Sequence, residues 1–575
     1  MRNILRCLLF LAPLCLCILS HSQAASYYVR TDGGTAGQCS GLADAPYPGS
    51  GTGQPCAWNH PFWALNAAGA WKISRGDTLI IRPGSYRLGI GAPNTSWCDT
   101  SYTYDCVLPP LPSGLDAQHP TRILGYGWNQ GCTQAPELWG SERPWQLLDL
   151  RGTSNAVVSC LELTDHSGCV ESFCPDCPGR TAVACKEDTY PYGNWASIGI
   201  VASDSNNVTL QNLNIHGLAH TGVHAARISN WTVQDVRIAG NGWCGWDGDM
   251  GENTSSNSGT LTFKRWIVEW NGCAETYPGR QPDHCWDQTH GGYGDGVGTH
   301  STRGHWIIED SIFRFNTSDG LDLLYVRENP SMIEIRRTQA YGNAGNPIKT
   351  SGPTKIENSL LIGNCGYFSG KPFAQEMSDH CRAGGNSLAL SIGQGNQITV
   401  VNSTIVGQGD CLVEAICDRE VPSTCNGTES AAFFNNIFRG YTEFIDPTDT
   451  TCLIYEEPVG ISTGAMDYNL IYNAKGSDCP RGANDLCGNP LFVGDSLNSF
   501  DGHLQPASPA IDSGLAVGGL IPAHDLEKLL RPWGLQVDRG AYEYGSVPIP
   551  QPPNPLPPSQ AGKPLPGVYL LLLDQ

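Results

Sequence analysis

A ten-residue phrase recurs along the chain and restricts the fold more than any other feature of the sequence. Five clear copies each close on an asparagine, and they span residues 232–241, 262–271, 307–316, 334–343 and 355–364. Weaker copies begin at Thr209, Thr399 and Ala432. Apolar and polar residues alternate within each copy, which is the period of a half-buried β-strand. The repeat therefore predicts a chain of many short strands.

The spacing of the copies indicates how these strands are stacked. Successive copies begin 23, 30, 45, 27, 21, 44 and 33 residues apart. The shorter intervals fit one coil of a β-solenoid, whereas the two longest fit either two coils or one coil with an insertion. A β-propeller needs four strands per repeat, and helical repeats place apolar residues three and four positions apart. We therefore expect an all-β, right-handed parallel β-helix with capped ends, in which the closing asparagines form a hydrogen-bonded ladder.

The segments around the repeat have distinct expected roles. Residues 1–24 combine a basic start, an apolar stretch and small residues before a cleavage site, which predicts a secretory signal peptide. The remaining boundaries are an N-terminal cap and first coils at 25–150 with a short helix at 60–72, a β-helix body at 151–515, a closing segment at 516–545 and a proline-rich tail at 546–575. The tail is expected to be an extended spacer outside the folded body.

Cysteine content and charge indicate the compartment and exclude some partners. Removal of residues 1–24 would leave 21 of the 24 cysteines, which predicts a secreted protein with a disulfide framework and an odd thiol. Cys273 and Cys285 flank an inserted segment and are expected to be joined to each other, whereas Cys174 and Cys177 have the spacing of a local disulfide or a metal site. A net charge of −21 argues against nucleic acid and anionic membranes as partners. We expect a monomer without a membrane span.

Alignment of the copies on their closing asparagine brings acidic residues and one lysine together. Asp319 and Asp322 are the third and sixth residues after Asn316, and Lys349 is the sixth after Asn343. Asp295 would lie beside Asp319 if residues 273–290 are an insertion. Close carboxylates repel unless a cation holds them, and oxygen ligands favour Ca²⁺. A lysine beside such an ion has its ammonium form disfavoured and can then act as a general base.

This pattern resembles the family-9 polysaccharide lyases, which are pectate lyases of the pectin-lyase-like superfamily. Their coils carry DG, then DDGxD, then GNGxK, and the matching stretches here are 294–296, 318–322 and 345–349. Ser318 and Pro347 depart from that pattern, because they replace an aspartate and a glycine.

The resemblance implies a calcium-dependent lyase that cleaves an acidic, pectate-like polysaccharide by β-elimination. Asp295, Asp319 and Asp322 would hold Ca²⁺, and Lys349 would take the proton from C5 of a uronic acid. Arg327, Arg303 and Arg336 are near in sequence and are candidates to bind the carboxylates of the substrate.

Other functions remain open for this chain. The loss of an acidic ligand at Ser318 and the proline-rich tail favour a non-catalytic surface protein that binds carbohydrate or acts as an adhesin. A polygalacturonase-like hydrolase is a minor alternative, because residues 316–319 resemble the NTD motif of those enzymes while their adjacent aspartate pair is missing. Asp319 and Asp322 are also compatible with a purely structural role as turn residues. In the inserted segment, Tyr277 and Trp286 are candidates to wall a carbohydrate cleft.

Overall fold

The computed structural model describes residues 24–171, 183–251, 255–287, 292–374, 377–417, 425–456, 462–516 and 521–546. The expected signal peptide, apart from Ala24, and the expected tail, apart from Ser546, lie outside these residues, as do Cys174 and Cys177. The chain forms two compact units. Unit 1 contains residues up to 167, 186–215 and 230–232, and unit 2 contains 168–185, 216–229 and 233 onward.

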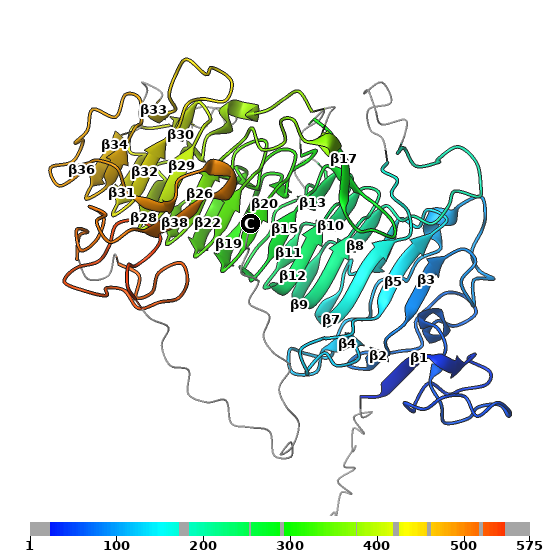
Figure 1. The fold of residues 1–575 in the computed structure, drawn as a ribbon. Coiled ribbons are helices and arrows are strands. Elements are labelled where there is room, and N and C mark those ends of the chain that lie inside the picture. Colours follow the sequence, from blue (N-terminus) through cyan, green and yellow to red (C-terminus); the bar gives the residue numbers. More distant parts are fainter. Residues whose placement is uncertain are drawn as a thin grey trace, which may run out of the picture. The chain divides into compact units, whose positions relative to one another are not determined.

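Unit 1 consists of parallel strands that pair in three runs (blue through cyan to blue-green in Figure 1). The first run is β1 (Ser26–Gly34), β2 (Thr78–Ile81), β4 (Thr121–Gly125), β7 (Ser154–Asp165) and β9 (Ser205–His216). The second run is β3 (Ser85–Gly89) and β5 (Glu137–Ser141), and it continues to β7. The third run is β6 (Gln146–Asp149) with β8 (Ile198–Ala202). Two 3₁₀ turns, η1 (Pro61–Ala64) and η2 (Thr103–Asp105), lie in the connections.

Unit 2 repeats the same plan over more coils, and each coil contributes one strand to each of three parallel rows (Figure 1). The first row is β10 (Thr221–Ala225), β13 (Cys244–Gly248), β18 (Val297–Thr299), β21 (Leu321–Leu323), β24 (Ile348–Thr350), β27 (Leu388–Ile392), β30 (Cys411–Cys417) and β33 (Cys452–Glu456). The second row is β14 (Thr260–Lys264), β19 (Thr302–Glu309), β22 (Val326–Arg336), β25 (Thr354–Glu357), β28 (Gln397–Val401), β31 (Ser430–Phe434) and β34 (Ser462–Asp467). The third row is β12 (Thr232–Ala239), β15 (Ile267–Glu269), β20 (Ile312–Arg314), β23 (Gln339–Tyr341), β26 (Leu360–Gly363), β29 (Thr404–Gly407), β32 (Ile437–Gly440), β35 (Leu470–Tyr472) and β36 (Leu486–Cys487).

Short elements complete unit 2. They are β11 (Ile228–Ser229), the antiparallel pairs β16 (Cys273–Glu275) with β17 (Pro282–Cys285) and β37 (Phe492–Gly494) with β38 (Asp501–Leu504), and the 3₁₀ turns η4 (Pro372–Ala374), η5 (Arg382–Gly385) and η6 (Leu497–Ser499). Parallel strands in stacked coils confirm the predicted parallel β-helix fold.

The register of the strands confirms the repeat. Thr262, Ile307, Glu334, Lys355 and Thr399, which begin successive copies, are direct cross-strand partners. The intervals of 45 and 44 residues are therefore single coils with insertions. The alternating apolar residues point inward, and Phe263, Trp266, Trp306 and Phe313 are all at most 1% exposed in the core.

The predicted asparagine ladder is present. Nδ2 of Asn241, Asn271 and Asn316 each donates to Oδ1 of the next ladder residue, ending at Asn343, and each distance is 2.9 Å. These side chains are buried, so the ladder satisfies amides that would otherwise be costly inside the solenoid. The ladder also explains a glycine of the repeat, because a Cβ at Gly320 would lie 2.7 Å from Nδ2 of Asn343.

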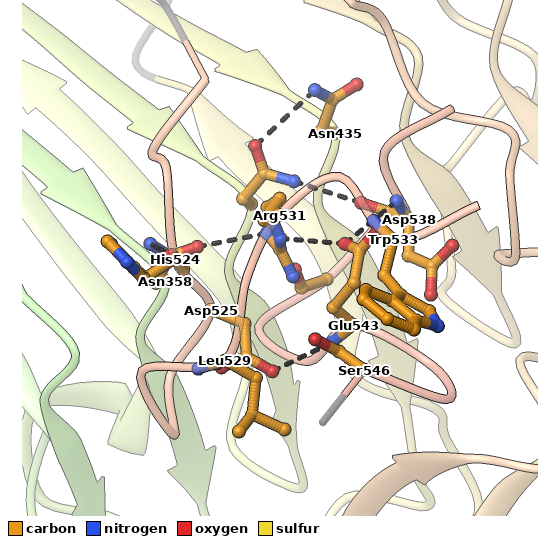
Figure 2. Close-up of polar contacts among 12 residues, drawn as sticks. Asn358, Asn435, His524, Asp525, Leu529, Arg531, Trp533, Asp538, Glu543 and Ser546 are labelled. Atoms are coloured by element: carbon orange, nitrogen blue, oxygen red, sulfur yellow. Dashed lines mark hydrogen bonds and ion pairs between the residues drawn. The ribbon is translucent and has the colours of Figure 1, made fainter. Parts of the chain in front are cut away.

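The closing segment of unit 2 is bound to the coils by buried polar side chains, which Figure 2 shows. Arg531 Nε lies 2.9 Å from Glu543 Oε2, and both side chains are fully buried. Arg531 Nη1 also donates to Asn358 Oδ1 at 2.9 Å. Asn402 Nδ2 donates to the carbonyl of Asp538 at 3.0 Å. Asn358 and Asn402 have left-handed φ values of 49° and 48°, a conformation that asparagine tolerates well.

Nine disulfides join cysteines within the described part of the chain, and they include the expected Cys273–Cys285 pair. Cys244 is a buried free thiol. The helix expected at 60–72 is only the 3₁₀ turn η1, because an antiparallel bridge between Leu65 and Trp71 follows at once.

Candidate metal and catalytic pocket

The first strand row of unit 2 brings the predicted site residues into register. Leu321 pairs with Val297 on one side and with Ile348 on the other, so Asp295 and Asp319, each two residues earlier, occupy equivalent positions. Asp322 is the direct partner of Lys349. Pro347 therefore does not displace the lysine from its position beside the acidic residues.

The four side chains meet in one buried cluster. Oxygens of Asp295, Asp319 and Asp322 all lie within 4.8 Å of one another. Lys349 Nζ lies 2.6 Å from Asp319 Oδ2 and 3.3 Å from Asp322 Oδ2. The three aspartates are 4%, 3% and 8% exposed, so little solvent screens the cluster.

Each carboxylate is oriented by a backbone amide. Asp295 Oδ1 accepts from the Asp319 N–H at 3.0 Å, and Asp322 Oδ1 accepts from the Leu324 N–H at 2.8 Å. Asp319 Oδ1 accepts from both N and Nδ2 of Asn346, at 2.6 and 3.0 Å. Asp322 thus has the turn contact expected as an alternative, whereas Asp319 Oδ1 bonds the next coil instead, and Oδ2 of both residues is left toward Lys349.

Burial and mutual repulsion shift the protonation equilibria of the cluster. Burial, and then the charges of Asp319 and Asp322, raise the pKa of Asp295 well above its usual value. Burial also raises the pKa of Asp322, while the ammonium of Lys349 opposes this shift. Burial lowers the pKa of Lys349, but the three carboxylates, led by Asp319, outweigh burial and raise it. Lys349 is consequently held as an ammonium among the aspartates.

The donor set fits a hard divalent cation. Three carboxyl groups lie beside a single ammonium in a buried place, where the charged forms of Asp295 and Asp322 are disfavoured unless a further cation is bound, and carboxylate oxygens are the ligands that Ca²⁺ prefers. Asp295, Asp319 and Asp322 could hold such an ion.

The cluster lies in a pocket of about 570 Å³ in unit 2. Its charged lining comprises Asp247, Asp249, Asp295, Asp319, Asp322, Lys349, Arg327 and Arg382. Carboxylates outnumber the lysine and arginines, so an anionic ligand would meet repulsion there unless a cation is bound.

Aromatic side chains in the pocket were not predicted from the sequence. The ring of Trp243 stacks on His220 with centroids 5.3 Å apart, and the guanidinium carbon of Arg327 lies 5.0 Å from the ring centroid of Tyr325. Burial lowers the pKa of His220 to about 3, so this imidazole is neutral. Trp243 follows Asn241 by two residues, and this position just after a closing asparagine is the signal that could have identified it.

The structure does not bring all predicted residues to the pocket. Arg327 lines it, whereas Arg303 lines a different pocket of about 510 Å³. Arg336 lies on β22 in the second strand row, where its Nη1 is 2.9 Å from Glu309 Oε1. Residues that are close in sequence lie on different faces of a coil, which is why proximity in sequence misplaced these two arginines.

The two aromatic candidates of the inserted segment do not wall the pocket either. Trp286 is 2% exposed and packs in a buried cluster with Val170, Ala274 and Tyr293. Tyr277 is 43% exposed and does not line the pocket. His224 occupies the position in an earlier coil that corresponds to Asp322 and Lys349. It contacts the carbonyl oxygen of Asp249 through Nε2 at 2.7 Å.

None of the known family models matches this sequence, and no curated protein matches it. Among solved structures, the chain is similar to pectate lyase Pel9A, with 15% identity over 91% of this chain and 97% of that chain and a TM-score of 0.44. It is similar to a rhamnogalacturonan lyase, with 12% identity over 82% and 91% of the two chains and a TM-score of 0.39. It is also similar to the A-module of the Azotobacter vinelandii mannuronan C-5 epimerase AlgE4, with 13% identity over 72% of this chain and 91% of that chain and a TM-score of 0.36. Similarity at these identities concerns the fold alone, so the geometry of the pocket has to carry the functional inference.

In the part of the chain that the structure describes, no helix is both long enough and apolar enough to cross a membrane.

Proposed function

We propose that this chain is a secreted, calcium-dependent polysaccharide lyase that cleaves a uronic-acid polymer by β-elimination. The observation that carries the proposal is the contact of Lys349 Nζ with Asp319 Oδ2, at 2.6 Å, inside a pocket that also contains Asp295 and Asp322. The disulfides support the extracellular location.

Lys349 supplies the base in this proposal. Its neutral amine takes the proton from C5 of the uronic acid, the electron pair of that C–H bond forms the C4–C5 double bond, and the C4–O4 bond breaks. The leaving oxygen takes a proton from solvent, and the new end of the chain is an unsaturated sugar. Proton removal by a positioned side chain contributes about 10²–10⁴-fold to a rate.

The carboxylates decide when Lys349 can act. While Asp319 and Asp322 are paired with the ammonium, the amine form is strongly disfavoured. When bound to Asp295, Asp319 and Asp322, Ca²⁺ would neutralise the negative charge of the carboxylates of protein and substrate and would make the C5 proton more acidic. Arg327 lines the same pocket, and its guanidinium is suited to hold a second substrate carboxylate.

Incubation of the secreted protein with polygalacturonate, alginate and other polyuronates tests the proposal. With calcium, we expect ultraviolet-absorbing unsaturated products from at least one polymer, and with chelator we expect none. For the loss of activity expected on substitution of Lys349, Lys355→Ala is the matched lysine control. Lys355 pairs with Glu357 at 2.6 Å on the second strand row, away from the pocket. If no polyuronate yields an unsaturated product in calcium, the proposal is wrong.

One observation favours a non-catalytic role as the second candidate. Lys349 makes two ion pairs, at 2.6 and 3.3 Å, which is also the arrangement of a structural lock. Binding of polyuronates with neither unsaturated ends nor new reducing ends would support that carbohydrate-binding role, whereas reducing ends alone would indicate a hydrolase.

A further inference from the structure

Unit 1 exposes several aromatic side chains. The exposed fraction lies between 39% and 55% for each of Tyr102, Tyr104, Tyr126, Trp128, Trp145 and Tyr190. Two of them, Tyr104 and Trp145, line a pocket of about 440 Å³. Large aromatic rings exposed around a hollow are typical of ligand-binding surfaces. We call this hollow the aromatic pocket, and its other lining residues are Asp105, Val107, Arg143, Gln146 and Arg151.

The polar groups of the aromatic pocket are held in place but remain accessible. The side chain of Arg151 is 48% exposed, and its Nη2 lies 2.6 Å from Asp149 Oδ2. The side chain of Arg143 is 30% exposed, its Nη2 lies 3.6 Å from Glu187 Oε2, and its guanidinium carbon lies 5.6 Å from the ring centroids of both Tyr192 and Trp195. Each guanidinium therefore presents donors from a fixed position.

The two aromatic residues are also fixed relative to each other. The backbone N–H of Trp145 donates to the backbone carbonyl of Tyr104 at 3.0 Å, and the Cys98–Cys106 disulfide closes the loop that carries Tyr104. Glu142 and Arg143 have consecutive left-handed φ values of 65° and 64°, which are uncommon for residues other than glycine. Strained backbone of this kind persists where the surroundings hold it, and here the N–H groups donate to the carbonyls of Gly193 and Trp195.

We infer that the aromatic pocket is a second, non-catalytic binding site for the acidic polysaccharide. The apolar faces of pyranose rings pack on indole and phenol rings, and the ring substituents offer hydroxyl and carboxylate groups to the arginines and to Asp105. Two arginines and one aspartate line this pocket, whereas five aspartates face one lysine and two arginines in the pocket of unit 2, so an anionic sugar is better accommodated here without a metal. The assignment to a polyuronate rests on the proposed function.

Binding measurements on the full-length protein test this inference. Affinity electrophoresis in gels with polygalacturonate or alginate, or with a neutral glucan, is run in the presence of chelator so that metal-dependent binding does not contribute. Trp145→Ala and Tyr104→Ala should each weaken binding of a polyuronate about tenfold or more, as expected for loss of a central aromatic contact. Trp128→Ala is the matched control, because Trp128 is 39% exposed but does not line the pocket, and it should leave binding unchanged. Tyr104→Phe keeps the ring and should retain most of the affinity.

The outcomes separate this inference from the proposed lyase. If Trp145→Ala and Trp128→Ala bind polyuronates equally well, or if the neutral glucan binds more tightly, the inference is wrong whatever the catalytic result. If Trp145→Ala loses affinity while the wild-type protein yields no unsaturated product, the binding site stands and the lyase proposal fails. Where cleavage occurs, Trp145→Ala should raise KM for the polymer, whereas Trp128→Ala should not.

Discussion

Lys349 Nζ lies 2.6 Å from Asp319 Oδ2, across two neighbouring coils, and this contact both places the lysine and favours its ammonium form. The three carboxylates raise its pKa, although burial alone would lower it. A cation on the same carboxylates would weaken this stabilisation of the ammonium. In the proposed function, proton transfer by Lys349 would therefore depend on occupancy of the cation site.

Substitution of Lys349 separates its catalytic role from its structural one. Lys349→Arg keeps a cation among the aspartates, but a guanidinium does not deprotonate, so we expect lyase activity to fall about 10²–10⁴-fold with little change in melting temperature. Lys349→Ala should lose activity to the same extent and also unfold more easily in chelator, because three buried carboxylates would remain without a cation. Product absorbance and thermal unfolding measure the two effects, and a wild-type rate for Lys349→Arg would rule out the base.

A further carboxylate at Ser318 should tighten cation binding. Ser318 is fully buried and hydrogen-bonds to Asp295, so Ser318→Asp would add a fourth oxygen ligand at the cluster. We expect at least about tenfold tighter calcium binding by titration calorimetry, which corresponds to about 1.4 kcal/mol, and a lower melting temperature in chelator because of added repulsion. Ser318→Ala removes the hydroxyl without adding charge and is the control. Unchanged calcium affinity of Ser318→Asp would contradict the assigned site.

The periodic part of this site could be predicted from the sequence, and the rest could not. Asp295, Asp319, Asp322 and Lys349 were placed correctly relative to one another because each coil repeats the same backbone geometry after its closing asparagine. Once that register is known, the spacing between parallel strands fixes which residues meet.

Nearness in sequence to the site obeys no such rule. Arg336 is the last residue of β22, in the second strand row, so its nearness in sequence to the site says nothing about its face of the coil. Tyr325 and the aromatic pocket of unit 1 belong to connections whose conformation depends on tertiary contacts. For the same reason, the sequence left open whether the 45-residue interval was one coil or two.

The asparagine ladder should be among the features on which the stability of unit 2 depends. Asn316 Oδ1 accepts from Nδ2 and from the backbone N of Asn271, at 2.9 and 3.1 Å. Asn316→Ala would leave these two buried donors without an acceptor, so we expect a loss of about 2–5 kcal/mol in the free energy of unfolding. Urea unfolding measures it, and Asn484→Ala is the control, because Asn484 makes an exposed contact with Asp467. Equal effects of the two substitutions would show that the ladder does not stabilise the coils.

His60 should make unit 1 less stable in mild acid. It is 6% exposed, its Nδ1 accepts from the Phe62 N–H at 3.1 Å and its Nε2 donates to the Arg87 carbonyl at 2.9 Å, so the imidazole is neutral. Burial lowers its pKa from 6.5 to about 4, although the Arg87 carbonyl opposes the shift. Below pH 6.5 the unfolded chain takes up a proton that the folded one does not, so stability present above pH 6.5 is lost as the pH falls toward 4.

The lowered pKa of His60 corresponds to about 2 kcal/mol lost between pH 7 and pH 5. His60→Asn can still cap the turn at Phe62 but does not titrate, so urea unfolding at the two pH values should show a loss smaller by this amount in the variant. His119→Asn is the control, because the side chain of His119 is 62% exposed, and it should behave like the wild-type protein. If the wild-type protein and His60→Asn lose the same stability on acidification, His60 does not remain neutral in the folded state.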